Sequence, residues 1–442
     1  MSERRYRVAP GGRVHGEIRV PGDKSVSHRA VLLGGIAQGT TKITGFLESA
    51  DCLATLAAMR AMGVRVERPA HGQVVVHGVG LQGLRAPDAA LDMGNAGTAL
   101  RLSMGLLAGQ RFSTTLVGDA SLTRRPMERA AAPLRLMGAR ITTTEGHAPI
   151  QIAGGSPLHG IAYDLTVPSA QVKSALLLAG LYAEGITAVT EHAVTRDHTE
   201  RMLKAFGVSV NSNDSTVSLH GGAELQGCAL EVPGDISSAA FFITAAALCA
   251  QGEFLIRDVG VNPTRTGVID ILRLMGADIR LLRPRMFGAE PVADLLIRAT
   301  PLHGIEVPAA LVPLAIDEFP VLFIAAAAAR GRTVVTNAAE LRVKESDRIS
   351  VMAAGLQAVG IRTEVRPDGI VIEGGEVQGG AIDSHGDHRI AMAFAVASVV
   401  ARSVIEIADV ENVATSFPEF AALAAGAGLE IEEFSGAQAE SP

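Results

Sequence analysis

Six copies of one short phrase divide the chain into nearly equal parts. Each phrase is the end of an apolar helix, then a glycine, then the start of a strand, as in Met59–Val66 (MRAMGVRV). Successive glycines are separated by 75, 69, 69, 84 and 68 residues. Self-similarity at a fixed period indicates a repeat architecture, here of six units. The glycines are Gly63, Gly138, Gly207, Gly276, Gly360 and Gly428.

The residues around each glycine predict a helix followed by a strand. A glycine just past a helix adopts the left-handed conformation at low cost. The residues after it are β-branched or alternate in polarity, as in Arg140–Thr144, and such residues favour a strand. We therefore expect an α/β fold.

A second, longer repeat divides the chain in two. Val20–Ser25 (VPGDKS) recurs 212 residues later as Val232–Ser237 (VPGDIS), and an apolar, helix-like run follows each copy. We predict one domain of residues 20–235 and a second domain of residues 1–19 and 236–442, with three units in each. Two chain crossings between the domains predict a hinge and a cleft that holds the active site.

Composition excludes several classes of function. The chain has no Trp, three Tyr and a net charge of −7, which disfavours a module that stacks bases or follows a phosphate backbone. Its three cysteines show neither metal-ligand spacing nor the even number of a disulfide framework, so we predict no metal and no other cofactor. No signal peptide or membrane span is recognisable, and we expect a monomeric, cytoplasmic chain that binds neither membranes nor nucleic acid.

Basic residues gather in the loops that precede apolar helices, with two acids among them. Free N–H groups and the dipole at a helix start favour anions there. The charges sum to +5, and two phosphorylated carboxylic acids, at about −5 to −6, would balance them. The cations are Lys24, Arg29, Arg125, Arg196, Lys344, Arg348 and Arg389, and the acids are Asp317 and Glu345.

Three local patterns suggest how helices begin near these cations. Ser25 can cap the helix that follows Lys24, and Ser169 can cap the helix of Val167–Leu181. Pro126, directly after Arg125, suits the first position of a third helix.

The segment Glu340–Ser350 could bring an acid close to two cations. If this segment is helical, Lys344 and Arg348 lie on one face with Glu345 close by, so Glu345 could donate or relay a proton. Asp317, at the start of a fully apolar helix, could act as a general base.

Each pattern also has a structural interpretation that leaves function open. The cations could be solvated charges on capped helices, Arg196 could pair with Asp197 or Glu200, and Glu340–Ser350 could be a salt-bridged surface helix. The acids at the start of the apolar helix could simply satisfy its dipole. His385, Asp387 and His388 match no established metal motif, and no Walker or dinucleotide-binding loop is present.

Taken together, the phrases around these residues resemble the EPSP synthase family. The match runs in order from residue 21 to 397, and Thr415–Phe420 (TSFPEF) extends it. The resemblance implies a two-domain, inside-out α/β barrel of six βαβαββ units, three per domain, with an EPT/RTPC-like fold. The phrases are PGDKSVSHRA, GNAGTALR, RRPM, SAQVKSALLLAG, TRDHTER, IDEFP, LRVKESDR and DHRIAMAFA.

The resemblance also implies a reaction and a role for each site residue. The enolpyruvyl group of phosphoenolpyruvate would pass to the 5-hydroxyl of shikimate 3-phosphate without a metal. Asp317 would take the hydroxyl proton, and Glu345, assisted by Lys24 or Lys344, would protonate the methylene carbon to give a ketal that loses phosphate. Shikimate 3-phosphate would be bound by Lys24, Ser25, Arg29, Ser169, Ala170, Gln171, Arg196, Asp317 and Lys344. Phosphoenolpyruvate would be bound by Lys24, Gly97, Arg125, Gln171, Arg348 and Arg389.

Two departures from the common family pattern resemble a divergent subgroup that includes glyphosate-tolerant members. Ala414–Phe417 lacks the lysine that many members carry before the late Phe-Pro, and Ser169–Ala170 stands where many have two serines. These departures leave open which group completes the phosphoenolpyruvate side. Gly97 is not the alanine found in tolerant members, so tolerance itself is not predicted.

Two other functions are consistent with six repeats. One is the sister enzyme that transfers enolpyruvate to UDP-N-acetylglucosamine, but its characteristic cysteine is absent from Gly118–Pro126. The other is a non-catalytic ring clamp on nucleic acid, which predicts basic residues on every repeat rather than at helix starts.

Overall fold

The structure of the protein is a computed structural model that describes residues 4–213 and 215–435. The chain divides into two compact units. Unit 1 comprises the residues up to Pro21, Gly234–Arg285 and the chain from Pro291 onward. Unit 2 comprises Gly22–Pro233 and a short separate segment, Met286–Glu290, which the sequence had led us to expect in the other domain.

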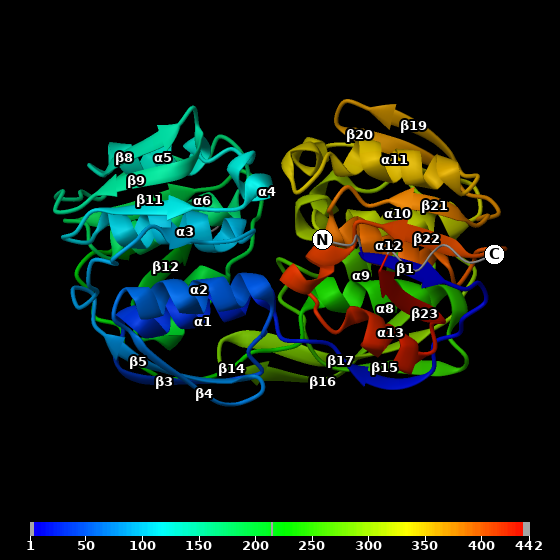
Figure 1. Ribbon diagram of the computed structural model, residues 1–442, viewed down its shortest axis with the longest axis horizontal. Helices are drawn as coiled ribbons and strands as arrows, with labels where there is room; N and C mark the ends of the chain where they lie inside the picture. The colour runs from blue at the N-terminus through cyan, green and yellow to red at the C-terminus, as the bar shows by residue number, and fades with distance from the viewer. Residues whose placement is uncertain (1–3, 214, 436–442) are drawn as a thin grey trace. The chain divides into compact units, whose positions relative to one another are not determined.

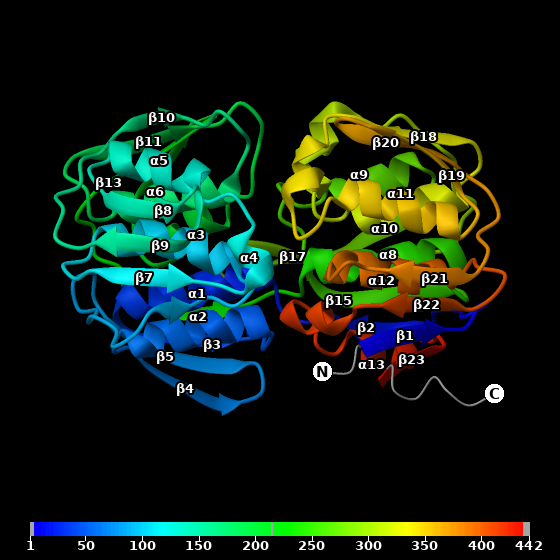
Figure 2. The ribbon, with the colours of Figure 1, turned by 45° about the horizontal axis from the view of Figure 1, so that its top comes forward.

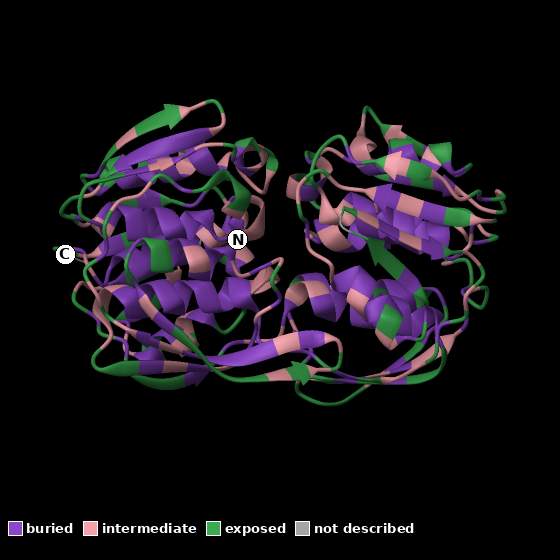
Figure 3. Cartoon of the chain, turned by 180° about the vertical axis from the view of Figure 1, so that it is seen from behind, coloured by how far each residue is buried: buried purple, intermediate pink, exposed green. Residues whose placement is uncertain are grey.

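Inner helices rich in apolar residues occupy the core of each unit (Figures 1 and 2). They are buried on nearly all sides (Figure 3), as expected of helices without a continuous polar face. In unit 2 they are α1 (Lys24–Ile36), α3 (Gly97–Ala108) and α6 (Ala170–Gly180). In unit 1 they are α8 (Ile236–Cys249), α10 (Phe319–Ala328) and α12 (His388–Ala397).

Outer helices end at the repeated glycines. All six glycines of the repeated phrase have φ between 87° and 109°, so the predicted left-handed helix ends are confirmed. The outer helices of unit 2 are α2 (Ala50–Ala61), α5 (Glu128–Leu136) and α7 (His198–Ala205). Those of unit 1 are α9 (Gly267–Leu274), α11 (Arg348–Ala358) and α13 (Phe420–Ala427). Short helical turns are α4 (Ala120–Thr123), η1 (Ala309–Leu311), η2 (Pro313–Ala315), η3 (Ala339–Val343) and η4 (Glu411–Thr415).

Unit 2 contains three sheets with one common topology. In each, the first two strands are parallel and the remaining pairs are antiparallel. The first sheet is β14 (Ala229–Glu231), β3 (Gln38–Thr44), β5 (Gln73–Val79) and β4 (Arg65–Ala70). The second is β6 (Leu91–Asp92), β7 (Thr114–Val117), β9 (His147–Ala153) and β8 (Arg140–Thr144). The third is β10 (Ala162–Asp164), β11 (Ile186–Thr190), β13 (Thr216–His220) and β12 (Val210–Asn213).

The first and third sheets of unit 1 also combine one parallel strand pair with antiparallel pairs, whereas the second consists of three antiparallel strands. The first is β16 (Asp278–Phe287), β17 (Glu290–Arg298), β15 (Glu253–Gly260) and β2 (Gly16–Arg19). The second is β18 (Arg332–Val335), β20 (Gly369–Glu373) and β19 (Arg362–Arg366). The third is β21 (Gly380–Asp383), β22 (Ile405–Ala408), β1 (Arg4–Val8) and β23 (Ile431–Ser435). Because β1 pairs with β22 and β23, the beginning of the chain completes the last repeat.

The expected α/β fold of βαβαββ repeats is therefore confirmed. Each unit has its own apolar core, which consists of the inner helices and the buried faces of its sheets. Side chains at the first turns of the inner helices contact one another, as Arg101 of α3 and Gln171 of α6 do in unit 2. The inner helices of a unit therefore present their N-terminal ends together, and this arrangement positions the polar residues described next.

Candidate active site

The first turn of α1 places Lys24 beside an acid. Asp23 is the N-cap, because its side chain accepts a hydrogen bond from the Val26 N–H at 2.9 Å. The prediction that Ser25 caps this helix is therefore wrong, because Ser25 is the second residue of the helix. Lys24 Nζ lies 2.5 Å from Asp51 Oδ2, so an anionic ligand would share this lysine with a carboxylate.

Arg29 lies inside unit 2 rather than at its surface, with 3% of the residue exposed. It donates to Ser25 O at 2.9 Å, Ser174 Oγ at 2.9 Å and Thr199 Oγ1 at 2.7 Å. Burial lowers the pKa of Arg29 to about 10, and the carboxylate of Glu200 opposes that shift. Arg29 thus ties α1 to α6 and α7, and it contacts the segment around Ser25 through a carbonyl oxygen.

Two arginines meet at the start of α3. Arg101 Nη1 donates to Gln171 Oε1 at 2.7 Å, and Arg125 Nη1 donates to Asn95 O at 3.3 Å. A Cβ atom at Gly97 would lie 3.0 Å from Arg101 Nη1 and 3.2 Å from Arg125 Nη1. Glycine at this position lets both guanidinium groups approach the start of α3, so the structure brings Gly97, Arg125 and Gln171 together.

The α6 helix begins as predicted. Ser169 is its N-cap and accepts a hydrogen bond from the Val172 N–H at 3.4 Å, and Ala170 is its first residue. Gln171 also donates to Thr98 Oγ1 at 2.9 Å, which joins the starts of α6 and α3.

Two other helices of unit 2 begin near the predicted residues, with one difference from expectation. The half-buried Arg196 lies just before α7, which starts at His198. Pro126 is not the first residue of a helix, because α5 starts at Glu128.

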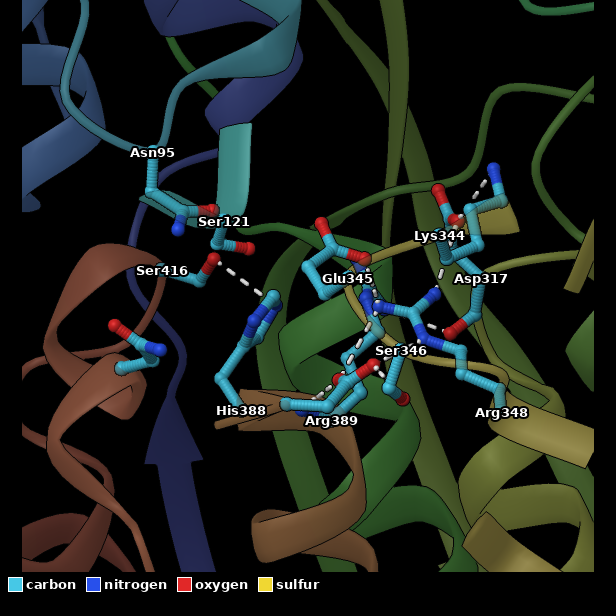
Figure 4. A network of polar contacts seen from close by, with 12 residues as sticks. Asn95, Ser121, Asp317, Lys344, Glu345, Ser346, Arg348, His388, Arg389 and Ser416 are labelled. Carbon is cyan, nitrogen blue, oxygen red and sulfur yellow. Dashed lines mark hydrogen bonds and ion pairs between the residues drawn. The ribbon is translucent and has the colours of Figure 1, made fainter. Parts of the chain in front are cut away.

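In unit 1, Arg348 is the centre of an acidic cluster (Figure 4). Its buried guanidinium contacts Asp387 through Nε at 2.8 Å, Glu345 through Nη2 at 2.6 Å and Asp317 through Nη1 at 3.5 Å. Burial alone would lower the pKa of Arg348, but these three carboxylates outweigh burial and raise it above its usual value. Arg348 is therefore a fixed positive charge that joins both predicted proton carriers.

Lys344 reaches the same cluster by a different backbone route from the one expected. Residues 344–347 are not helical: η3 ends at Val343 and α11 starts at Arg348, with Asp347 as its N-cap. The prediction that Lys344 and Arg348 lie on one face of a helix is therefore wrong. The two cations still converge, because Lys344 Nζ lies 3.3 Å from Asp317 Oδ1.

Arg389 follows the first residue of α12, as predicted. The N-cap of this helix is the buried Asp387, which accepts a hydrogen bond from the Arg389 N–H at 3.0 Å. The guanidinium donates through Nη1 to Asp317 O at 2.9 Å. Asp387 thus holds both Arg348 and the start of α12, a role that the sequence did not reveal.

The late segment that lacks a lysine also lies next to α12. Ser416 Oγ is 3.1 Å from Nε2 of the buried His388 (Figure 4). Asn412 donates to Gly386 O at 2.8 Å in the loop that precedes the helix. Neutral polar groups therefore stand here, in the segment where many family members carry a cation.

Other residues of these clusters were not identified from the sequence. Arg101 ends the phrase GNAGTALR, and its position one helical turn after Gly97 was the signal that could have revealed it. For the side-chain partners of Lys24 and Arg29 no local signal exists, because Asp51, Ser174 and Thr199 come from distant segments. Within residues 4–213 and 215–435, no helix is long and apolar enough to cross a membrane, and no three His, Cys, Asp or Glu side chains form a metal-binding group.

The six repeats of the chain form the same fold as solved enolpyruvyl transferases, and this fold defines the class of protein. The transferase NikO from Streptomyces tendae shares this fold at 18% identity, with a TM-score of 0.80 over 99% of this chain and 100% of that one. An EPSP synthase structure from Acinetobacter baumannii matches at 55% identity, with a TM-score of 0.88 over 98% of this chain and 100% of the other.

Sequence relatives narrow the class to one family. Residues 8–423 match the family described as EPSP synthase (3-phosphoshikimate 1-carboxyvinyltransferase). A relative of that name from Methylococcus capsulatus is 61% identical over 97% of this chain and 98% of its own length. Another, from Alkalilimnicola ehrlichii, is 59% identical over 96% of both chains. The chain belongs to the EPSP synthase family.

Proposed function

We propose that the protein transfers the enolpyruvyl group of phosphoenolpyruvate to the 5-hydroxyl of shikimate 3-phosphate. Membership of the EPSP synthase family over residues 8–423 supports this reaction. The geometric support is that one buried guanidinium, that of Arg348, contacts both acids of the proposed reaction, Asp317 and Glu345, and so holds the two close together.

The proposed reaction begins at Asp317. Its carboxylate takes the proton of the 5-hydroxyl while the hydroxyl oxygen attacks C2 of phosphoenolpyruvate. Lys344 Nζ at 3.3 Å and Arg348 Nη1 at 3.5 Å stabilise negative charge on this carboxylate before the proton arrives.

Glu345 acts at the other carbon of the double bond. It donates a proton to C3, which becomes a methyl group in a tetrahedral ketal, with Lys24 or Lys344 assisting. A C3 proton then returns to Glu345 as the bond between C2 and the phosphate oxygen breaks, and the proton held by Asp317 passes to the departing phosphate, which leaves as hydrogen phosphate. The products are the enolpyruvyl ether and inorganic phosphate, and the charges of Arg125, Arg348 and Arg389 balance the phosphate and carboxylate groups throughout.

Binding of the two substrates is divided among the groups described above. We assign shikimate 3-phosphate to one set of residues, in which Arg29 acts through Ser25 and the start of α7 rather than from an exposed surface. That set is Lys24, Ser25, Arg29, Ser169, Ala170, Gln171, Arg196, Asp317 and Lys344. The set for phosphoenolpyruvate is Lys24, Gly97, Arg125, Gln171, Arg348 and Arg389.

A phosphate-release assay tests the reaction and the alternative acceptor. We expect phosphate release from phosphoenolpyruvate with shikimate 3-phosphate and none with UDP-N-acetylglucosamine. Release with the nucleotide sugar alone would overturn the proposal. We also propose that the chain acts as a monomer in the cytoplasm, and light scattering on the purified protein checks the monomeric state.

Substitution of the two acids tests their roles. Asp317→Ala and Glu345→Gln should each lower turnover by about 100-fold or more, because general acid–base catalysis contributes a factor of about 10² to 10⁴. Circular dichroism should show an unchanged fold. Near-normal turnover in both variants would refute the assignment.

A further inference from the structure

A buried polar network lies behind Arg389 at the starts of α8 and α10. Its central residue is Glu318, which follows Asp317 directly and whose side chain is 1% exposed. Ser237 donates a hydrogen bond to Glu318 Oε1. Arg265 Nη2 lies 2.7 Å from Ser237 Oγ and 3.8 Å from Glu318 Oε1.

The network meets the ligand-binding set at one atom of Arg389. Nη1 of Arg389 lies 3.7 Å from Glu318 Oε1 and donates to Asp317 O at 2.9 Å. Within the described part of the chain, every hydrogen bond and ion pair of the Arg389 guanidinium uses Nη1. The rest of the guanidinium, Nε and Nη2, is therefore available for an anion.

A purely structural role does not account for the state of Glu318. Its second oxygen, Oε2, is buried and makes no hydrogen bond to any residue in 4–213 or 215–435. A buried polar atom without a partner costs about 1–3 kcal/mol, and more for a charged group. Burying a carboxylate here stabilises the fold little, but it places a negative charge between the guanidinium groups of Arg265 and Arg389.

We propose that Glu318 is a positioning residue for the phosphoenolpyruvate side of the active site. Its carboxylate attracts Nη1 of Arg389, which holds the guanidinium in one orientation and directs Nε and Nη2 toward the ligand. Ser237 and Arg265 hold the carboxylate in turn. This inference rests on the proposed function, because it assigns Arg389 to phosphoenolpyruvate.

Glu318→Gln is the informative variant, since glutamine keeps the side-chain size and can still accept from Ser237. Loss of one charged contact to Arg389 should raise the KM for phosphoenolpyruvate about 10-fold. The KM for shikimate 3-phosphate should change less than about 2-fold, because Arg389 is not assigned to that substrate. Glu318→Asp keeps the charge and should recover part of the loss.

Asp294→Asn is the matched control. Asp294 is in the same unit, is 2% exposed, and pairs with Arg257 at 3.0 Å and Arg285 at 2.8 Å. Asp294→Asn removes a buried carboxylate that is paired with two arginines, so it should lower the thermal midpoint, but it should leave both KM values unchanged. Equal effects of the two variants on the KM for phosphoenolpyruvate would overturn the inference, as would a Glu318→Gln defect confined to stability.

The inference and the proposed function fail in different ways. If the wild-type chain releases no phosphate, the proposed function is lost. Calorimetry with phosphoenolpyruvate alone then decides the role of Glu318: weaker binding by Glu318→Gln than by wild type supports it, and equal binding overturns it. If Glu318→Gln does not fold, the same comparison is made with Ser237→Ala, which removes the hydrogen bond that holds the Glu318 carboxylate, and unchanged binding overturns the inference.

Discussion

Replacing Gly97 by alanine tests whether the start of α3 is a binding surface or only a helix end. The new Cβ atom would lie 3.0 Å from Arg101 Nη1 and 3.2 Å from Arg125 Nη1. Ordinary contacts begin near 3.4 Å, so both guanidinium groups must move by a few tenths of an ångström. The atom of Arg101 nearest the new Cβ, Nη1, donates to Gln171 Oε1 at 2.7 Å, whereas Nη1 of Arg125 donates to Asn95 O at the longer distance of 3.3 Å. Most of the displacement should therefore fall on Arg125.

The expected magnitude follows from what Arg125 contributes. A hydrogen bond to a charged group contributes about 1.5–3 kcal/mol, and a small displacement should remove roughly a third of it. A loss of about 0.5–1 kcal/mol corresponds to a KM for phosphoenolpyruvate raised about 2- to 5-fold. Stability should not fall, because Gly97 does not have a left-handed φ and alanine is the better helix former.

Steady-state kinetics and thermal unfolding of Gly97→Ala measure the two effects separately. Gly426→Ala is the control, because Gly426 lies in α13 with no atom within 4 Å of its Cβ position. The control should gain about 0.5–1 kcal/mol in unfolding free energy and leave both KM values unchanged. An unchanged KM for phosphoenolpyruvate in Gly97→Ala would refute the binding role of Arg125, and a large loss of stability would refute the packing argument.

Two further predictions concern buried charges. The side chain of Lys173 is 2% exposed and its Nζ lies 3.0 Å from the half-buried Glu191 and 2.7 Å from the buried Glu200. Lys173→Met leaves both carboxylates without this cation and should cost about 3–5 kcal/mol in a denaturant titration. A cost below about 1 kcal/mol would contradict this. Burial acts to raise the pKa of Asp294, but hydrogen bonds from a backbone N–H and from two arginines outweigh it and lower the pKa to about 2. Because the pKa of Asp294 is lower in the folded protein than in the unfolded chain, where it is about 3.9, the ionised carboxylate stabilises the fold at pH values above about 3.9. This stabilisation is lost as the pH falls toward about 2. The difference in unfolding free energy between wild type and Asp294→Asn should therefore be large at about pH 5 and small by about pH 2.5. A gap that stays constant with pH would contradict the shift.

The sequence predicted the fold because its signals are local. A glycine after an apolar helix reports its own backbone conformation, and all six such glycines are left-handed. Fully apolar runs such as Phe319–Ala328 can only be buried, so they identified the inner helices. These inferences need no knowledge of distant contacts.

The site was predicted less completely because its contacts are not local. Arg29 looked like an exposed ligand, but its partners Ser174 and Thr199 are 145 and 170 residues away in the sequence. Lys344 and Arg348 looked like neighbours on one helix, yet Lys344 reaches Asp317 from a non-helical turn and Arg348 from the first residue of α11. Charge pattern alone cannot distinguish a cation that faces a ligand from one that links two inner helices.

The two copies of the duplicated phrase share a helix cap but differ in the residue that follows it. Asp23 and Asp235 cap α1 and α8 with nearly the same backbone angles, so the local fold is common to both copies. Lys24 of the first copy corresponds to Ile236 of the second, which is buried and apolar. The serine in the next position remains, but in unit 1 Ser237 binds Glu318, which faces Arg389 at the start of α12.

In the proposed function, an inner helix of each unit contributes a cation at its start, and this is the first inner helix (Lys24) in unit 2 and the third (Arg389) in unit 1. A helix start favours an anion whichever helix supplies it, because the N–H groups and the dipole are properties of the backbone. The side chain that adds the full charge can therefore move from one inner helix to another without changing the fold. In unit 1 the second copy of the phrase has no cation after its capping aspartate, and its serine instead donates to Glu318, whose carboxylate lies 3.7 Å from Arg389 Nη1.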